Sequence, residues 1–323
     1  MRFFRSRNAK EIYDNAQKAH EKGDFQKAVE LYTHAIEIDA NYTDAYHGRA
    51  FTYDDLGEHA KAIADYSKVI ELDAKHAKAY NNRALNYSSL NRYEYAAKDL
   101  NKAIEIDPNF TTAYVNLGHV YADLKDYERA IAKYSEAIAL EPDHFLAYHS
   151  RANIYSFLGD FKSAFEDYNQ AIKFNANHAR SYYKRGVAFY DSNDFKSAFD
   201  DFNEAIKLDP NYAPSYYMRG LLYYNDSRFV KDAIADFDKA IRLNPNHTES
   251  YFMRARALHG LGDIKNALED YNEAVRLNQN DAYNFYYRGF CLYHAGDLQS
   301  AIADFDRAIE LNPNHAASYY NRA

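Results

Sequence analysis

The sequence repeats itself every 34 residues, and this period constrains the fold more than any other feature. In the stretch that starts at Thr111, small, aromatic and proline residues stand at fixed places, and similar residues return one period earlier and one period later. The recurring residues of this stretch are Tyr114, Gly118, Tyr121, Ala130, Tyr134, Ala137 and Pro142. Self-similarity at such a period is typical of a solenoid built from stacked copies of one small unit. We therefore expect one elongated array instead of a globular domain.

Each repeat has the pattern of two helices joined by a turn. Tyr114, Gly118 and Tyr121 follow the spacing of one helix face, and the residues from Ala130 to Ala137 follow it again. Between the two helices, most repeats place a glycine, which accepts the left-handed backbone at a helix end, or an aspartate suited to cap the next helix. The predicted turn glycines are Gly23, Gly57, Gly159, Gly262 and Gly296, and the predicted caps are Asp24, Asp126, Asp160, Asp194, Asp263 and Asp297.

These columns resemble the tetratricopeptide repeat in their period and in their small and aromatic residues. The resemblance covers residues 9–315 as a single array of nine repeats, with a basic segment at residues 1–8 and the truncated first helix of a tenth repeat at residues 316–323. It implies an all-α fold, a right-handed superhelical α-solenoid of stacked antiparallel helix pairs. The seventh repeat departs from the pattern, because it carries one extra residue between Ser227 and Ala233.

Composition excludes several classes of function. The net charge of −8 and the isoelectric point near 5.9 argue against a nucleic-acid or membrane-surface binder, and no apolar run is long enough to insert into a membrane. Cys291 is the only cysteine, so an internal disulfide is excluded. The sequence contains no nucleophile–base set, metal-ligand spacing or phosphate loop. We expect a cytoplasmic protein that is not an enzyme and that needs no cofactor or metal.

Seven repeats carry an arginine in the first helix and an aspartate in the second, and the two exceptional repeats lack both residues. This coincidence predicts an ion pair within each repeat and favours a structural role for these arginines. The pairs are Arg49 with Asp65, Arg83 with Asp99, Arg151 with Asp167, Arg185 with Asp201, Arg219 with Asp236, Arg254 with Asp270, and Arg288 with Asp304.

The resemblance also implies that the first helices line a concave groove, which holds a peptide or helix of a partner protein. The groove-facing columns are mostly polar in the first five repeats and aromatic in the last four. Because other aromatic columns already serve the core, we expect these residues to contact a partner, with packing inside the array as the alternative. The set, called the aromatic strip below, is Tyr183, Val187, Tyr190, Tyr217, Leu221, Tyr224, Phe252, Arg256, Tyr286, Phe290 and Tyr293.

Three further residues among the strip, Arg180, Lys184 and His259, are candidates to contact a carboxylate of the partner, and ordinary solvated charge is the alternative. The leading hypothesis is a scaffold or adaptor that binds a protein or peptide in this groove.

Two alternatives stay open. One is self-assembly into a head-to-tail oligomer, in which the basic and aromatic start of the chain meets an acidic, tyrosine-lined groove, and the uncapped C-terminal end contributes. The start in question comprises Arg2, Phe3, Phe4, Arg5 and Arg7. The other is the recognition arm of a larger enzyme. Because the last repeat breaks off within its first helix, we expect the chain to be part of a longer protein.

Overall fold

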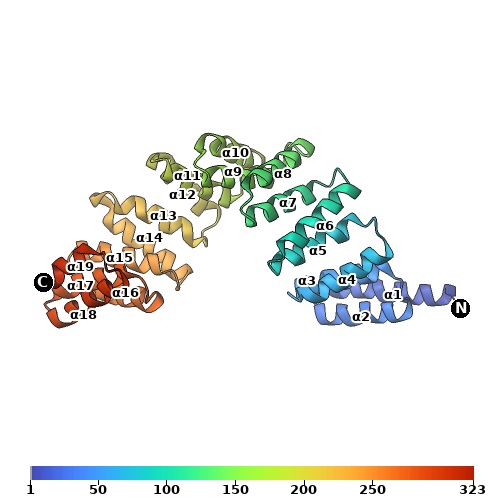
Figure 1. The fold of residues 1–323 in the computed structure, drawn as a ribbon, viewed down its shortest axis with the longest axis horizontal. Coiled ribbons are helices and arrows are strands. Elements are labelled where there is room, and N and C mark those ends of the chain that lie inside the picture. Colours follow the sequence, from blue (N-terminus) through green and yellow to red (C-terminus); the bar gives the residue numbers. More distant parts are fainter. Residues whose placement is uncertain (1) are drawn as a thin grey trace. The chain divides into compact units, whose positions relative to one another are not determined.

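The computed structural model describes the backbone of residues 2–323 and the side chains of residues 8–323. Within that range it contains nineteen α-helices, one short 3-10 helix and no strand. Within each of two compact units, successive helices pair antiparallel and stack side by side (Figure 1), and the described chain order gives nine pairs followed by one further helix. The predicted all-α solenoid of stacked helix pairs is confirmed. We call the first helix of each pair helix A and the second helix B.

The chain divides into two compact units, of which the first ends at Phe174. The backbone of the basic N-terminal segment belongs to its first helix, whereas the side chains of Arg2, Phe3, Phe4, Arg5 and Arg7 lie outside the described residues. Its helices are α1 (Arg2–Glu21), α2 (Phe25–Ile38), α3 (Thr43–Asp55), α4 (His59–Leu72), α5 (Ala77–Ser89), α6 (Tyr93–Ile106), α7 (Thr111–Asp123), α8 (Tyr127–Leu140), α9 (Phe145–Phe157) and α10 (Phe161–Phe174).

The second compact unit runs from Asn175 to Ala323 and carries every residue of the aromatic strip. Its helices are α11 (Ala179–Asp191), α12 (Phe195–Leu208), α13 (Ala213–Tyr224), the 3-10 helix η1 (Ser227–Phe229), α14 (Val230–Leu243), α15 (Thr248–Gly260), α16 (Ile264–Leu277), α17 (Ala282–Ala295), α18 (Leu298–Leu311) and α19 (Ala316–Arg322). No helix in the described part of either unit is long and apolar enough to span a bilayer.

The turns between helices A and B follow the predicted chemistry. All five predicted turn glycines have positive φ, between 71° and 84°. All six predicted aspartates accept a hydrogen bond from the backbone N–H three residues on, as N-caps do. In three repeats without the glycine, Asn91, Lys125 and Asn193 take the same left-handed conformation. The seventh repeat differs, because η1 occupies its turn and carries the extra residue.

The predicted arginine–aspartate pairs are also confirmed. In all seven, Nε and Nη2 of the arginine donate to the two carboxylate oxygens at 2.7 or 2.8 Å. The pairs add a contact that the sequence did not reveal. In the pairs of Arg49, Arg83, Arg151, Arg219, Arg254 and Arg288, the remaining Nη1 donates, over 2.6 to 3.0 Å, to helix B of the preceding repeat. The acceptors are Thr33, Ser67, Ser135, Asn203, Asp238 and Asn272. The arginines thus tie neighbouring repeats together as well as the helices of one repeat.

Candidate functional site

The aromatic strip lies on four A helices of the second compact unit, α11, α13, α15 and α17. The helix α15 carries two strip residues, Phe252 and Arg256, and each of the other three helices carries three. Spacings of four and three residues place these positions on one helix face. All strip side chains are half-buried except that of Tyr293, which is 53 % exposed. The strip is therefore neither core nor free surface, and its members differ in what they contact.

The first position on each helix packs against the protein itself. Each of these rings packs against a buried ring of helix B in the same repeat, with ring centroids 6.0 or 6.1 Å apart. The pairs are Tyr183 with Phe202, Tyr217 with Phe237, Phe252 with Tyr271, and Tyr286 with Phe305. Such contacts stabilise the helix pair, so packing accounts for part of these four side chains' burial.

Three of these rings also contact the junction with the next repeat. Tyr183 meets Tyr212 at 5.1 Å, Tyr217 meets His247 at 4.9 Å, and Tyr286 meets His315 at 4.7 Å between ring centroids. Burial raises the pKa of both Tyr183 and Tyr217 to about 12. Both hydroxyls therefore stay protonated at neutral pH and remain able to donate a hydrogen bond.

Arg256 on α15 is the centre of the strip. Its guanidinium carbon lies 5.4 Å from the ring centre of Tyr224 on α13, 5.8 Å from that of Phe252, and 4.9 Å from that of Tyr287 on α17. A cation within about 6 Å of an aromatic ring centre is attracted by the ring. Side chains from three successive A helices are thus gathered around one positive charge.

Within residues 8–323, no carboxylate forms an ion pair with Arg256, and the polar contact that its Nη1 makes there is with the sulfur of Met253 at 4.0 Å. Each of the seven paired arginines, by contrast, has both oxygens of an aspartate. The neutral hydroxyl of Tyr271 lies near Arg256, is buried and has no hydrogen-bond partner among the described residues. This part of the strip therefore holds a half-buried cation without a counter-ion, which is the arrangement that attracts an anion.

The three candidate carboxylate contacts fall into two groups. Arg180 and Lys184 on α11 are exposed and lie beside the rings of Tyr212 and Tyr183, at 6.0 and 5.9 Å from the ring centres. His259 instead meets His294, with Nε2 and Nδ1 2.7 Å apart, and burial followed by the neighbouring histidine lowers its pKa. A neutral imidazole attracts a carboxylate weakly, so Arg180 and Lys184 are better placed for that contact.

Three residues that contact the aromatic strip were not predicted from the repeat pattern of the sequence. Tyr287 stands in a column that carries Asn82 and Lys184 in other repeats, so no pattern marked it as aromatic. His294 has no repeated counterpart that would signal its contact with His259. Asn321 lies in the incomplete tenth repeat, and its side chain donates to the hydroxyl of Tyr286 at 3.1 Å.

The first compact unit presents a different surface on its A helices. The first two A helices and their neighbours enclose a hollow of 320 Å³. Its walls are Tyr13, Gln17, His20, Glu21, Tyr32, His47, Gly48, Phe51 and Asn82. The hollow is lined by aromatic as well as polar side chains, whereas the sequence predicts a mostly polar face for the early repeats.

Comparison with known families covers nearly the whole chain. A family model described as the ETO1 C-terminal domain matches residues 7–187. Models described as the tetratricopeptide repeat match residues 179–212, 217–284 and 282–315. None of the curated proteins matches the chain.

Solved structures agree on the fold. The chain resembles Pseudomonas aeruginosa pilF with 20 % identity and a TM-score of 0.59, over 65 % of this chain and 95 % of pilF. It resembles a chain of the APC/C hetero-tetramer Cut9–Hcn1 with 15 % identity and a TM-score of 0.59, over 97 % of this chain and 75 % of that one. A tetratricopeptide repeat protein from Parabacteroides merdae aligns with 18 % identity and a TM-score of 0.54, over 76 % and 97 %. At these identities the likeness bears on the fold alone.

Proposed function

We infer the function of this chain from its family: it is a tetratricopeptide repeat protein, and residues 7–187, more than half of its length, belong to the ETO1 C-terminal domain family. Tetratricopeptide repeats are protein-binding scaffolds, and no catalytic family matches the chain. We propose that it is an adaptor whose second compact unit binds an extended or helical segment of a partner protein along the aromatic strip.

The observation that carries this proposal is Arg256, a half-buried cation among three aromatic rings with no carboxylate partner in the described part of the chain. A carboxylate of the partner, either a side chain or a chain end, would supply the missing counter-ion. A charge-assisted hydrogen bond in such a place contributes about 1.5–3 kcal/mol. The exposed Arg180 and Lys184 favour the same acidic chemistry at the α11 end of the strip.

The aromatic members supply contact area around that charge. Tyr224 borders Arg256, Phe290 stacks on Tyr286 at 6.3 Å, and Tyr293 is largely open to solvent. Tyrosine is enriched among the residues that dominate binding energy, because it combines a large ring with a hydrogen-bonding hydroxyl. Tyr217 is a poor probe of binding, because removing its ring also removes contacts with Phe237 and His247.

The test begins with selection of binding peptides from a random library on the intact chain, which needs no knowledge of the natural partner. The selected peptide is then titrated against wild type, Arg256→Gln, Tyr224→Ala with Tyr293→Ala, and Arg242→Gln, which changes an exposed arginine on helix B and serves as control. We expect a loss of affinity of about tenfold or more for Arg256→Gln, which corresponds to about 1.4 kcal/mol, and no change for Arg242→Gln.

A second comparison isolates the carboxylate. Converting the acidic groups of the selected peptide to amides should weaken its binding to wild type but leave its weaker binding to Arg256→Gln unchanged. Thermal melting of each variant checks that the fold is intact. Peptides that bind a well-folded Arg256→Gln and the double tyrosine variant as tightly as wild type would overturn the proposal.

A further inference from the structure

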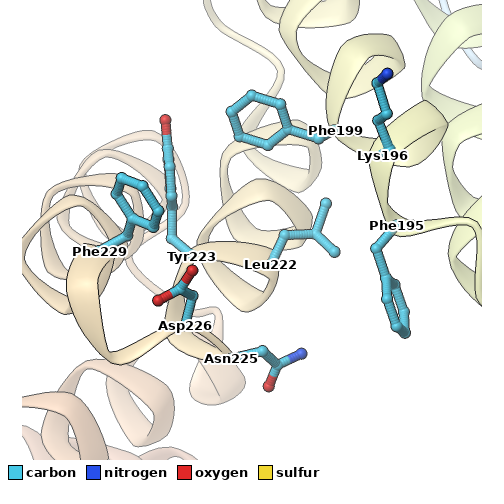
Figure 2. A pocket seen from close by; sticks show the side chains of 8 residues that line it. All are labelled: Phe195, Lys196, Phe199, Leu222, Tyr223, Asn225, Asp226 and Phe229. Carbon is cyan, nitrogen blue, oxygen red and sulfur yellow. The ribbon is translucent and has the colours of Figure 1, made fainter.

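The second compact unit contains an apolar pocket away from the aromatic strip, at the turn of the seventh repeat. Its volume is 510 Å³, within the range of roughly 300–1,000 Å³ that is usual for small-molecule sites. Figure 2 shows Phe195, Lys196 and Phe199 of α12 on one side of the pocket. Tyr223 of α13 and Phe229 of η1 lie on the other side, with Leu222 of α13 between the two sides. The lining residues are Phe195, Lys196, Phe199, Leu222, Tyr223, Asn225, Asp226 and Phe229.

The arrangement of the rings around this pocket differs from that of a sequence twin. The pentapeptide Phe-Lys-Ser-Ala-Phe occurs at residues 161–165 and again at 195–199. In the first copy the two phenylalanine rings stack, with centroids 6.3 Å apart. In the second copy Phe195 meets Tyr190 at 5.5 Å, and Phe199 meets Tyr223 edge-on at 5.3 Å. The rings at the start of α12 thus form separate walls.

The extra residue of the seventh repeat completes the pocket. It is accommodated by η1, which places Phe229 against Tyr223 at 5.8 Å between ring centroids. The turn column that holds glycine or another left-handed residue in the other repeats is occupied here by this 3-10 turn. Phe229 stands one 34-residue period after Phe195, and η1 makes it the aromatic wall of the pocket beside Tyr223.

The charges at the rim leave one cation unpaired. Asp226 is paired with Arg228 at 2.5 Å, and hydrogen bonds from Arg228 lower the pKa of that carboxyl to about 2. The carboxylate of nearby Asp194 caps α12 through the backbone N–H of Ser197. Lys196 is exposed, and no carboxylate in residues 8–323 forms an ion pair with it. The rim therefore combines an ion-paired carboxylate with the ammonium group of Lys196, which lies near the Asp194 carboxylate but forms no ion pair with it in residues 8–323.

We propose that this pocket is a second binding site, for a small aromatic molecule that carries one anionic group. The rings of Phe195, Phe199 and Phe229 would enclose the apolar part of the ligand, and the ammonium group of Lys196 would meet its anion. The site lies at the turn end of the helices and is lined by no residue of the aromatic strip, although its wall Phe195 contacts Tyr190 of the strip at 5.5 Å.

Two matched probes test the site by calorimetry: 1-anilinonaphthalene-8-sulfonate, which has the aromatic group and an anion, and N-phenyl-1-naphthylamine, which has the same rings without the charge. We expect wild type to bind both probes, and the sulfonate more tightly. Lys196→Gln should weaken the sulfonate by about threefold, as expected for an exposed ion pair, and leave the neutral probe unchanged. Leu222→Trp, which fills the space between the walls, should abolish binding of both.

Lys162→Gln is the control, because it makes the same change in the twin pentapeptide and should alter neither titration. Melting curves establish that Leu222→Trp remains folded, and Phe229→Ala, which removes a wall without filling the pocket, gives an independent variant that should also weaken both probes. The proposal is overturned if folded Leu222→Trp and Phe229→Ala bind the probes like wild type. It is also overturned if Lys196→Gln and Lys162→Gln weaken the sulfonate equally.

Discussion

At the scale of single residues, removing one partner of an arginine–aspartate pair should lower the free energy of unfolding more than replacing both partners with apolar residues. Burial raises the pKa of Asp201 even though Arg185 donates two hydrogen bonds to it, so desolvation outweighs the attraction. Asp201→Ala would strand a mostly buried guanidinium, and we expect a loss of about 3 kcal/mol in the free energy of unfolding. The double change Arg185→Leu with Asp201→Leu removes both charges and should cost less. Urea unfolding followed by circular dichroism measures both; an equal or larger loss in the double variant would contradict this account.

His47 is a second residue whose environment makes a prediction. Its ring stacks on His76 at 5.2 Å, and its Nε2 is buried without a hydrogen-bond partner in the described structure. Burial, followed by repulsion from His76, lowers its pKa from 6.5 to about 4. As the pH falls, the unfolded chain therefore binds a proton at His47 at a higher pH than the folded chain does. The contribution of neutral His47 to the free energy of unfolding is present above about pH 6.5 and is lost as the pH falls toward 4.

We expect the free energy of unfolding of wild type to fall between pH 7 and pH 4 by about 2 kcal/mol more than that of His47→Gln, which has no titrating group there. Chemical denaturation at a series of pH values gives both curves, and the comparison cancels the effect of histidines that do not contact His47. Curves that stay parallel over this interval would show that His47 is as easily protonated in the folded protein as in the unfolded chain.

At the scale of helices and turns, the small-residue column sets how closely helices A and B approach. A methyl group on Gly118 in α7 would lie 2.5 Å from the ring of Tyr134 in α8, which is fully enclosed. Gly118→Ala should therefore reduce the free energy of unfolding by about 1–2 kcal/mol through overpacking. Gly260→Ala is the matched control, since that helical glycine has open space around it and alanine should raise stability by about 0.5–1 kcal/mol. Thermal melts that shift in the same direction for both variants would rule out this role for the close approach.

Some features of the helices and turns could be predicted from the sequence, and others could not. Turn glycines, caps and paired charges recur in fixed columns, so their roles followed from the period. Lys125 did not, because lysine gives no signal of a left-handed turn, whereas asparagine, as at Asn91, adopts that conformation next most readily after glycine. The acceptors that receive Nη1 of the arginines vary between threonine, serine, asparagine and aspartate, so no single residue type marks that column. The position of the extra residue was visible in the sequence, but the contact of Phe229 with Tyr223 depends on how η1 directs that ring.

At the scale of the whole molecule, a repeat protein is stabilised by each repeat and its immediate neighbours. The helix contacts within the second compact unit run from each helix to the next and between the A helices of neighbouring repeats, and that unit holds both the aromatic strip and the apolar pocket. We therefore expect a fragment of residues 175–323 to fold without the first compact unit.

Its helical circular dichroism per residue should match that of the full chain, and it should melt cooperatively at a lower temperature, because it has fewer repeats. The peptide selected on the full chain should bind the fragment with an affinity within about threefold, roughly 0.6 kcal/mol. A fragment with little helicity would show that the strip depends on the first unit for its stability, and a well-folded fragment that no longer binds the peptide would place part of the binding surface in the earlier repeats.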